Sequence, residues 1–132
     1  MAKPTQKNIV FGKTQLLSAI AASAMLKPER LHIKELDGDV FVKRMTLGER
    51  DQYFLDMKNV RESGGNGNAE AFISAIVTED GDYMFSADDL DQVRGLPPAL
   101  TTAVLNKFYE VNRFMNVDAD DTDEAEAEVK NS

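Results

Sequence analysis

The sequence of 132 residues contains no cysteine and only one histidine. Without cysteine the chain cannot form disulfide bonds, thiolate nucleophiles or cysteine-ligated metal sites, and this composition is compatible with a reducing cytoplasm. A single histidine, His32, cannot supply a histidine-rich metal shell or a cysteine–histidine pair, and we expect it to face solvent. No serine lies in a nucleophile elbow. We therefore predict a protein that is not an enzyme, with no catalytic residues, no cofactor and no metal site.

The chain also lacks the run of about 18 apolar residues that a membrane-spanning helix needs. Its most apolar stretch, Leu16–Leu26, is interrupted by Ser18 and Ser23. Lysines precede this stretch, as in a signal peptide, but Lys27 and Pro28 follow it without a secretory cleavage pattern. We therefore expect no membrane partner and interpret residues 13–27 as an amphipathic core helix. Its apolar side would consist of Leu16, Leu17, Ile20, Ala24 and Met25.

Charge is unevenly distributed along the chain, whose formal net charge is −8. Residues 117–132 contain seven carboxylates and one lysine, a net charge of −6. Like charges repel and little apolar surface is present, so this segment is predicted to be a disordered acidic tail. Only residues 1–13 are distinctly basic, which disfavours nucleic-acid binding. We expect a flexible basic arm at residues 1–12, one globular domain at 13–116 and the tail at 117–132.

Residues 31–45 have the alternating pattern of a β-hairpin. Apolar and polar residues alternate through Leu31–Leu36 and again through Asp39–Met45. The intervening Asp37-Gly38 favours a tight two-residue turn, because both residues tolerate positive φ. In this arrangement Leu31 and Ile33 face the core.

A helix is predicted directly after the hairpin. Thr46 and Glu49 have the spacing of a capping box, in which each side chain satisfies a free backbone donor at the helix start. The helix would run from Leu47 to about Val60 and place Leu47, Tyr53 or Phe54, Met57 and Val60 toward the core.

The middle of the chain alternates between loops and short elements. Ser63–Asn68 contains three glycines, lacks the lysine and hydroxyl of a phosphate-binding loop and is interpreted as a connector. Asn68 is then placed to cap a helix over residues 69–77, although the β-branched content leaves a buried strand as an alternative. A short strand at Met84–Phe85 is followed by Ser86, which is expected to cap a helix over residues 87–94 that ends at Gly95.

Two acidic turns, Asp37-Gly38-Asp39 and Asp80-Gly81-Asp82, suggest a calcium-binding loop. In such a loop the glycine is the sixth residue and the first residue supplies an oxygen ligand. Placing either glycine there makes the first residue Ile33 or Ile76, neither of which has an oxygen-bearing side chain. Local turn chemistry therefore explains both turns without a metal ion.

The last predicted helix begins near Pro98 and runs to Phe114 or Met115. It has an apolar stripe, at steps of three and four residues, that is typical of a core-facing helix. The stripe is also richer in aromatic side chains than one narrow core contact requires, so part of it is a candidate partner-binding surface. The stripe consists of Leu100, Val104, Phe108, Val111 and Met115, and the candidate binding residues are Phe108, Tyr109, Phe114 and Met115.

Together these elements predict an α+β fold that is predominantly helical, with four to five helices and one or two short β-hairpins. The segment Gly38–Asp51, G-D-V-F-V-K-R-M-T-L-G-E-R-D, is followed by the bulky pair Tyr53-Phe54. This order of motifs resembles the tail assembly chaperones of long-tailed, lambda-like bacteriophages. The resemblance continues more loosely through residues 72–85 and 96–100, and it covers residues 31–116.

The resemblance implies a non-enzymatic assembly factor that binds the tape measure protein and promotes polymerisation of the major tail tube protein. It also implies weak homo-oligomers, action in the host cytoplasm and absence from the mature virion. In this family a programmed translational frameshift commonly yields a longer product, and Lys130-Asn131 is compatible with a slippery run of adenines. The alternative is a phage or bacterial regulatory adaptor that binds a transcription or signalling partner.

Overall fold

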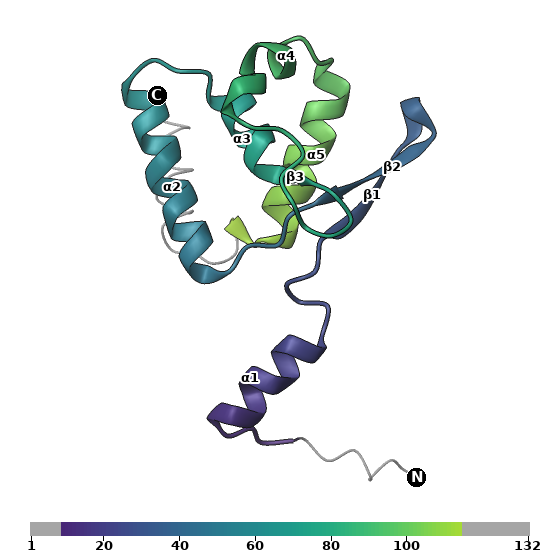
Figure 1. Cartoon of the computed structure of the whole chain (residues 1–132), viewed down its shortest axis with the longest axis vertical. Coiled ribbons are helices and arrows are strands. Elements are labelled where there is room, and N and C mark those ends of the chain that lie inside the picture. The colour runs from purple at the N-terminus through teal and green to yellow at the C-terminus, as the bar shows by residue number, and fades with distance from the viewer. Residues whose placement is uncertain (1–8, 115–132) are drawn as a thin grey trace, which may run out of the picture.

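The computed structural model describes residues 9–114, so the predicted acidic tail and most of the basic arm lie outside the described residues (Figure 1). The described part combines helices with a three-stranded antiparallel sheet of order β1-β2-β3, which confirms the predominantly helical α+β fold. The elements in chain order are α1 (Lys13–Ala22), β1 (Glu29–Ile33), the 3₁₀ turn η1 (Lys34–Leu36), β2 (Gly38–Val42), α2 (Leu47–Glu62), α3 (Gly67–Ala75), β3 (Ile76–Val77), the 3₁₀ turn η2 (Ala87–Asp89), α4 (Leu90–Arg94) and α5 (Pro98–Val111).

The hairpin of β1 and β2 is confirmed, but its predicted two-residue turn is wrong. The last pair in register is Ile33 with Gly38, so four residues connect the strands. Asp37 adopts the left-handed conformation with φ 48°, and its N–H donates to the carbonyl of Lys34 at 3.1 Å, which closes the 3₁₀ turn. Gly38 is therefore the first residue of β2 rather than part of the turn.

The capping box at the start of α2 is confirmed. Glu49 N–H donates to Thr46 Oγ1 at 3.1 Å, and Thr46 N–H donates to Glu49 Oε1 at 2.9 Å. Of the two aromatic residues considered for the core, Tyr53 is buried. The inward placement of Leu47 is wrong, because this residue is 71% exposed. It belongs to the first turn of α2, before the helix packs against the body.

Residues 67–77 combine the helix and the strand that the sequence left as alternatives. Gly67–Ala75 is helical, and the β-branched pair Ile76–Val77 then forms β3, paired with Phe41 and Val42 of β2. The predicted cap at Asn68 is wrong. The helix starts two residues earlier, with Asn66 at the N-cap position, and that side chain makes no capping hydrogen bond.

The next connection follows the prediction in part. Ser86 Oγ accepts from Asp88 N–H at 3.3 Å and caps the η2 turn that leads into α4, and Gly95 is the C-cap of α4. No strand forms at Met84–Phe85. Instead Tyr83 makes an isolated bridge to Val77, and Met84 N–H donates to the carbonyl of Ile76 at 3.4 Å.

The core lies where α3, α4 and α5 meet the sheet and the inner face of α2 (Figure 1). Phe72 and Phe108 are its largest fully buried side chains. The hairpin contributes Val42 from its buried face, while Leu31 packs against the edge of the cluster and His32 points outward. The buried cluster consists of Val42, Tyr53, Ala71, Phe72, Ala75, Ile76, Val93, Val104, Leu105 and Phe108.

The prediction of a core helix over residues 13–27 is wrong in two respects, the end of the helix and its burial. The helix is present, but it ends at Ala22, where Ser23 is the C-cap, and it contains no buried residue. It lies apart from the body below the sheet, at the end of the connecting segment 23–28 (Figure 1). Amphipathic spacing therefore predicted the helix correctly, but the surface that its apolar side would cover is not part of this core.

Candidate partner-binding surface

The apolar stripe of α5 divides into a buried part and a surface part. Phe108 is 0% exposed, so it belongs to the core and cannot contact a partner in this conformation. Tyr109 and Phe114 are half-buried at the surface, where binding by these two residues stays a prediction. Met115 lies outside the described residues.

The surface part belongs to an aromatic cluster formed by Tyr53, Phe54, Phe108, Tyr109 and Phe114. The Phe114 ring contacts each of the other four, with centroid distances between 5.0 and 5.5 Å. Tyr53 and Phe108 also meet edge to face at 5.3 Å, a favourable arrangement of aromatic quadrupoles. The cluster therefore joins α2 to the end of α5.

The position of Phe114 depends on a reversal of the chain that spacing did not predict. The helix was expected to continue to residue 114 or 115, but α5 ends at Val111. Arg113 has φ 57°, a left-handed conformation that is common just after a helix end. This turn directs Phe114 back onto the aromatic cluster instead of along the helix axis.

Tyr53 serves as a structural member of the cluster. Burial raises the pKa of the Tyr53 hydroxyl well above its ordinary value, and the neighbouring Tyr109 raises it further. The hydroxyl therefore stays protonated across the physiological pH range, which makes it unsuited to acid–base exchange.

A groove of about 410 Å³ lies beside the aromatic cluster. It is formed where α2 and the end of α5 meet the segment 23–28 that follows α1. Its lining combines apolar side chains with three arginines and contains no carboxylate. A lining of apolar and basic side chains is chemically compatible with an amphipathic segment that carries acidic residues. The lining residues are Met25, Arg44, Met45, Thr46, Leu47, Arg50, Val111, Asn112 and Arg113.

The arginines of this groove are in different environments. The guanidinium group of Arg50 lies 5.2 Å from the ring centre of Phe54 and 5.8 Å from that of Phe114, in cation–π contact. Arg44 pairs with Glu29 of β1. Arg113 is exposed, and no ion pair of its side chain is recorded within residues 9–114. The sequence contained no signal for this groove, because its lining residues come from four separate stretches of the chain: Met25, Arg44–Leu47, Arg50 and Val111–Arg113.

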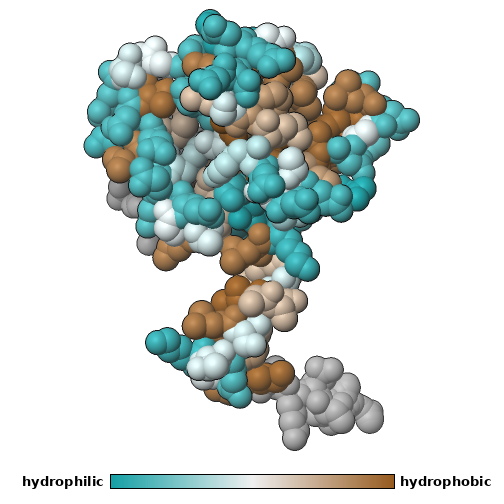
Figure 2. Space-filling view, in the orientation of Figure 1, coloured by the Kyte–Doolittle hydropathy of each residue, from teal (hydrophilic) through white to brown (hydrophobic). Residues whose placement is uncertain are grey.

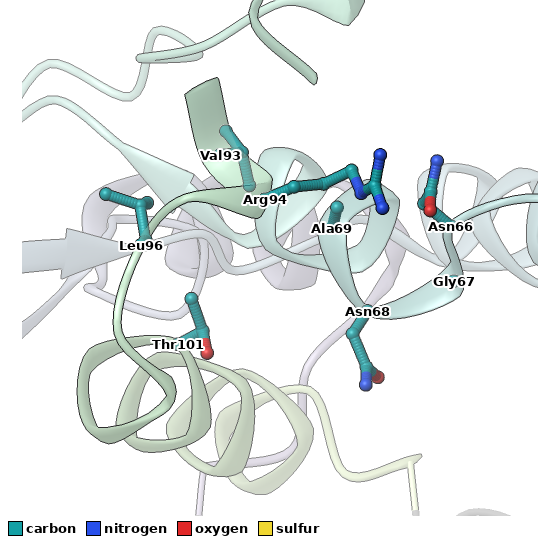
Figure 3. Close-up of a pocket in the computed structure, with 8 residues that line it drawn as sticks. All are labelled: Asn66, Gly67, Asn68, Ala69, Val93, Arg94, Leu96 and Thr101. Atoms are coloured by element: carbon teal, nitrogen blue, oxygen red, sulfur yellow. The ribbon is translucent and has the colours of Figure 1, made fainter. Parts of the chain in front are cut away.

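A second hollow, of about 310 Å³, lies between the start of α3, α4 and the start of α5 (Figure 3). In Figure 3 the side chain of Asn68 points away from Arg94, and Leu96 and Thr101 lie across the hollow from Asn66. These side chains provide amides, one cation and one hydroxyl. They do not include a nucleophile with an adjacent general base.

The remaining candidates for chemistry have structural roles. Asp39 pairs with His32 at 2.7 Å and with Arg30 at 2.7 Å on the outer face of the hairpin. The hydrogen bond from His32, followed by that from Arg30, lowers the pKa of Asp39. Within residues 9–114, no group of three or more His, Cys, Asp or Glu side chains is arranged to hold a metal ion. No helix in that range is both long and apolar enough to cross a bilayer.

The fold and this surface describe a small, predominantly helical α+β protein, and sequence comparison assigns its class. A family model described as phage tail assembly chaperone (TAC) matches residues 3–112. Because that match spans most of the chain, the protein belongs to the phage tail assembly chaperone family. The resemblance to tail assembly chaperones is therefore confirmed.

A solved structure supports the same fold. The tail assembly chaperone of bacteriophage HK97 superposes with a TM-score of 0.51 at 19% sequence identity, covering 74% of this chain and 94% of that chain. At this identity the likeness shows a shared fold only. No curated protein sequence matches the chain.

Proposed function

We propose that this chaperone binds the tape measure protein of a lambda-like siphophage and promotes polymerisation of the major tail tube protein around it, without enzymatic activity. Membership of the tail assembly chaperone family carries the proposal. It favours this role over a regulatory adaptor that binds a transcription or signalling partner. The proposed place of action is the host cytoplasm, and the chaperone would be absent from the mature virion.

The aromatic cluster and its groove support binding of an apolar helical segment. Tyr109 and Phe114 are half-buried, so each ring can bury further area when a partner covers it. The neighbouring groove adds the exposed methionine Met25. Methionine adapts to irregular apolar partners, which suits a client that presents many different segments along its length.

The arginine-rich rim supports a preference within the client. Arg113 is exposed at the groove, whereas Arg44 is already paired with Glu29, so Arg113 is the arginine that the proposal uses. The proposed client segment is therefore an amphipathic helix with apolar residues on one side and carboxylates at its border.

Co-expression with the tape measure protein tests the proposal. The wild-type chain should keep the tape measure protein soluble, and Arg113→Glu should weaken the complex by about tenfold, because it reverses one charge at the rim. The matched control is Arg94→Glu, which reverses an exposed arginine of α4 outside this groove. If wild type leaves the tape measure protein insoluble, the proposed function fails. If both variants bind equally well, the groove is not the binding site.

The programmed frameshift stays a prediction that sequencing of the gene can test. A coding sequence with a slippery heptamer in its last codons and an open overlapping frame would support a longer second product. The weak self-association also stays a prediction. The exposed helix α1 is a candidate surface for it.

A further inference from the structure

The N-terminal segment leaves an unusual amount of apolar surface in water. Figure 2 shows apolar side chains along α1 and its flanks, below the narrow connection to the body. Their exposed fractions range from 45% at Leu16 to 89% at Val10. The exposed large apolar residues of this segment are Ile9, Val10, Phe11, Leu16, Leu17, Met25 and Leu26.

The helix itself is two-sided. At 100° per residue, Lys13, Leu16, Leu17 and Ile20 fall on one side of α1, and Thr14, Gln15 and Ser18 fall on the other. This spacing is typical of a helix that packs against another surface. Within residues 9–114 that surface is not supplied by the same chain, because α1 contains no buried residue.

The exposed area is sufficient for a protein interface. Fully burying one large aliphatic side chain removes about 60–120 Å² from water, so seven side chains exposed by roughly half or more present on the order of 400 Å². One side of a standard interface buries about 800 Å², of which somewhat more than half, roughly 450 Å², is apolar. The N-terminal segment alone therefore provides most of the apolar surface that one side of a stable interface needs.

Charge identifies a second copy of the chain as a fitting partner. Residues 1–28 contain four lysines and no carboxylate, a net charge of +4. Residues 29–132 contain 11 basic and 23 acidic residues, a net charge of −12. The segment of one copy is therefore attracted to the remainder of another, whereas two N-terminal segments repel each other.

The outer face of α2 has the complementary pattern. Leu47, Asp51 and Leu55 follow one another at four-residue steps, so they form a stripe on one side of the helix. Leu47 is 71% and Leu55 is 51% exposed. The stripe thus places a carboxylate between two leucines, while α1 places Lys13 between the directions of Leu16 and Leu17.

We propose that α1 of one copy docks on the outer face of α2 of a second copy, with its leucines against Leu47 and Leu55 and Lys13 beside Asp51. We call α1 the donor surface and the outer face of α2 the acceptor surface. Because these surfaces differ, the contact is heterologous, and each added copy presents a new acceptor surface. The result is a head-to-tail row of copies. This proposal names the contact behind the self-association that is part of the proposed function, and it rests on the proposed function in that respect alone. The contact itself requires no tape measure protein, so it can be tested separately.

Sedimentation of the purified full-length chain, without any client, tests the contact. The mass of wild type should increase with concentration from the micromolar range upward. Leu17→Glu damages the donor and Leu55→Glu damages the acceptor, so each variant alone should self-associate at least about tenfold more weakly. The matched control Ser18→Glu adds the same charge on the opposite side of α1 and should behave like wild type. Circular dichroism melts establish that each variant is folded.

A mixture of the two variants gives the decisive measurement. Leu17→Glu keeps its acceptor and Leu55→Glu keeps its donor, so the mixture should form a 1:1 heterodimer that cannot extend. A mixture that remains monomeric, or Leu55→Glu that self-associates as well as wild type, overturns the proposal. A monomeric wild type at high concentration overturns it too, and in each case binding of the tape measure protein remains a separate measurement.

Discussion

The side chain of Asn112 accepts a 2.6 Å hydrogen bond from the backbone N–H of Met45, a residue 67 positions earlier in the chain. The same amide donates to the carbonyl of Lys43 and to that of Phe108, each at 2.9 Å. One side chain therefore links the connection between β2 and α2 to the C-terminal end of α5 by hydrogen bonds. These hydrogen bonds stabilise the relative position of the two sides of the arginine-rimmed groove.

Replacing Asn112 should destabilise the body. Asn112→Ala leaves partly buried backbone groups of Met45 and Lys43 without their partner, which costs about 1–3 kcal/mol. The matched control is Asn106→Ala, at an exposed position of the same helix, which should change the free energy of unfolding by less than about 0.5 kcal/mol. Urea unfolding of both variants measures the difference, and equal stabilities would contradict the stabilising role of Asn112.

Phe108 should behave as a core residue. The Phe108→Ala variant removes a fully buried ring and should cost about 3–5 kcal/mol, enough to unfold part of the population of a domain of this size. Thermal melts and near-ultraviolet circular dichroism report the loss. A variant that melts like wild type would show that the ring is not part of the core in solution.

The capping box of α2 should contribute to stability. Thr46→Ala removes the hydroxyl that accepts from Glu49 N–H and should cost about 0.5–2 kcal/mol. Thr102→Ala, at an exposed position of α5, is a control for loss of a threonine side chain. If the two variants have the same unfolding midpoint, the cap contributes nothing measurable.

The same capping box predicts a pH dependence. The backbone N–H of Thr46 is the main cause that lowers the pKa of Glu49 below its ordinary value of 4.5. A lowered pKa in the folded state means that the stabilisation is present above pH 4.5 and is lost as the pH falls through the folded value. Glu49→Gln should therefore lose less stability than wild type between neutral pH and the acid range. Parallel acid-unfolding curves for the two proteins would rule this out.

Two glycines near α2 should respond in opposite directions to alanine. Gly64 has φ 71°, where an alanine is strained, so Gly64→Ala should cost about 1 kcal/mol. Gly48 lies in the first turn of α2, and a Cβ there meets no atom within 4 Å, so Gly48→Ala should stabilise the chain by up to about 1 kcal/mol. Unfolding midpoints of the pair check both signs.

Local sequence determined the secondary structure where one short-range interaction dominates. The capping pair Thr46 and Glu49 defined the start of α2, Ser86 defined the cap before α4, and alternation defined the inward face of β1. These features depend on backbone donors and side chains within a few residues, so spacing alone is informative. The family motif in residues 38–54 likewise lies in consecutive residues, which made the chaperone family visible in the sequence.

Tertiary structure decided the features that depend on distant segments. Amphipathic spacing is the same for a helix whose apolar face packs on its own core and for one whose apolar face is exposed. We therefore expected α1 to pack on the core, but it lies apart from the core. Alternation could not define the length of the hairpin turn, because, of Asp37 and Gly38, only Asp37 takes the left-handed conformation. The arginine-rimmed groove joins residues from four segments and depends on the turn at Arg113. Local periodicity reflects how a segment orders its own side chains, whereas a surface depends on which segments the folded chain brings together.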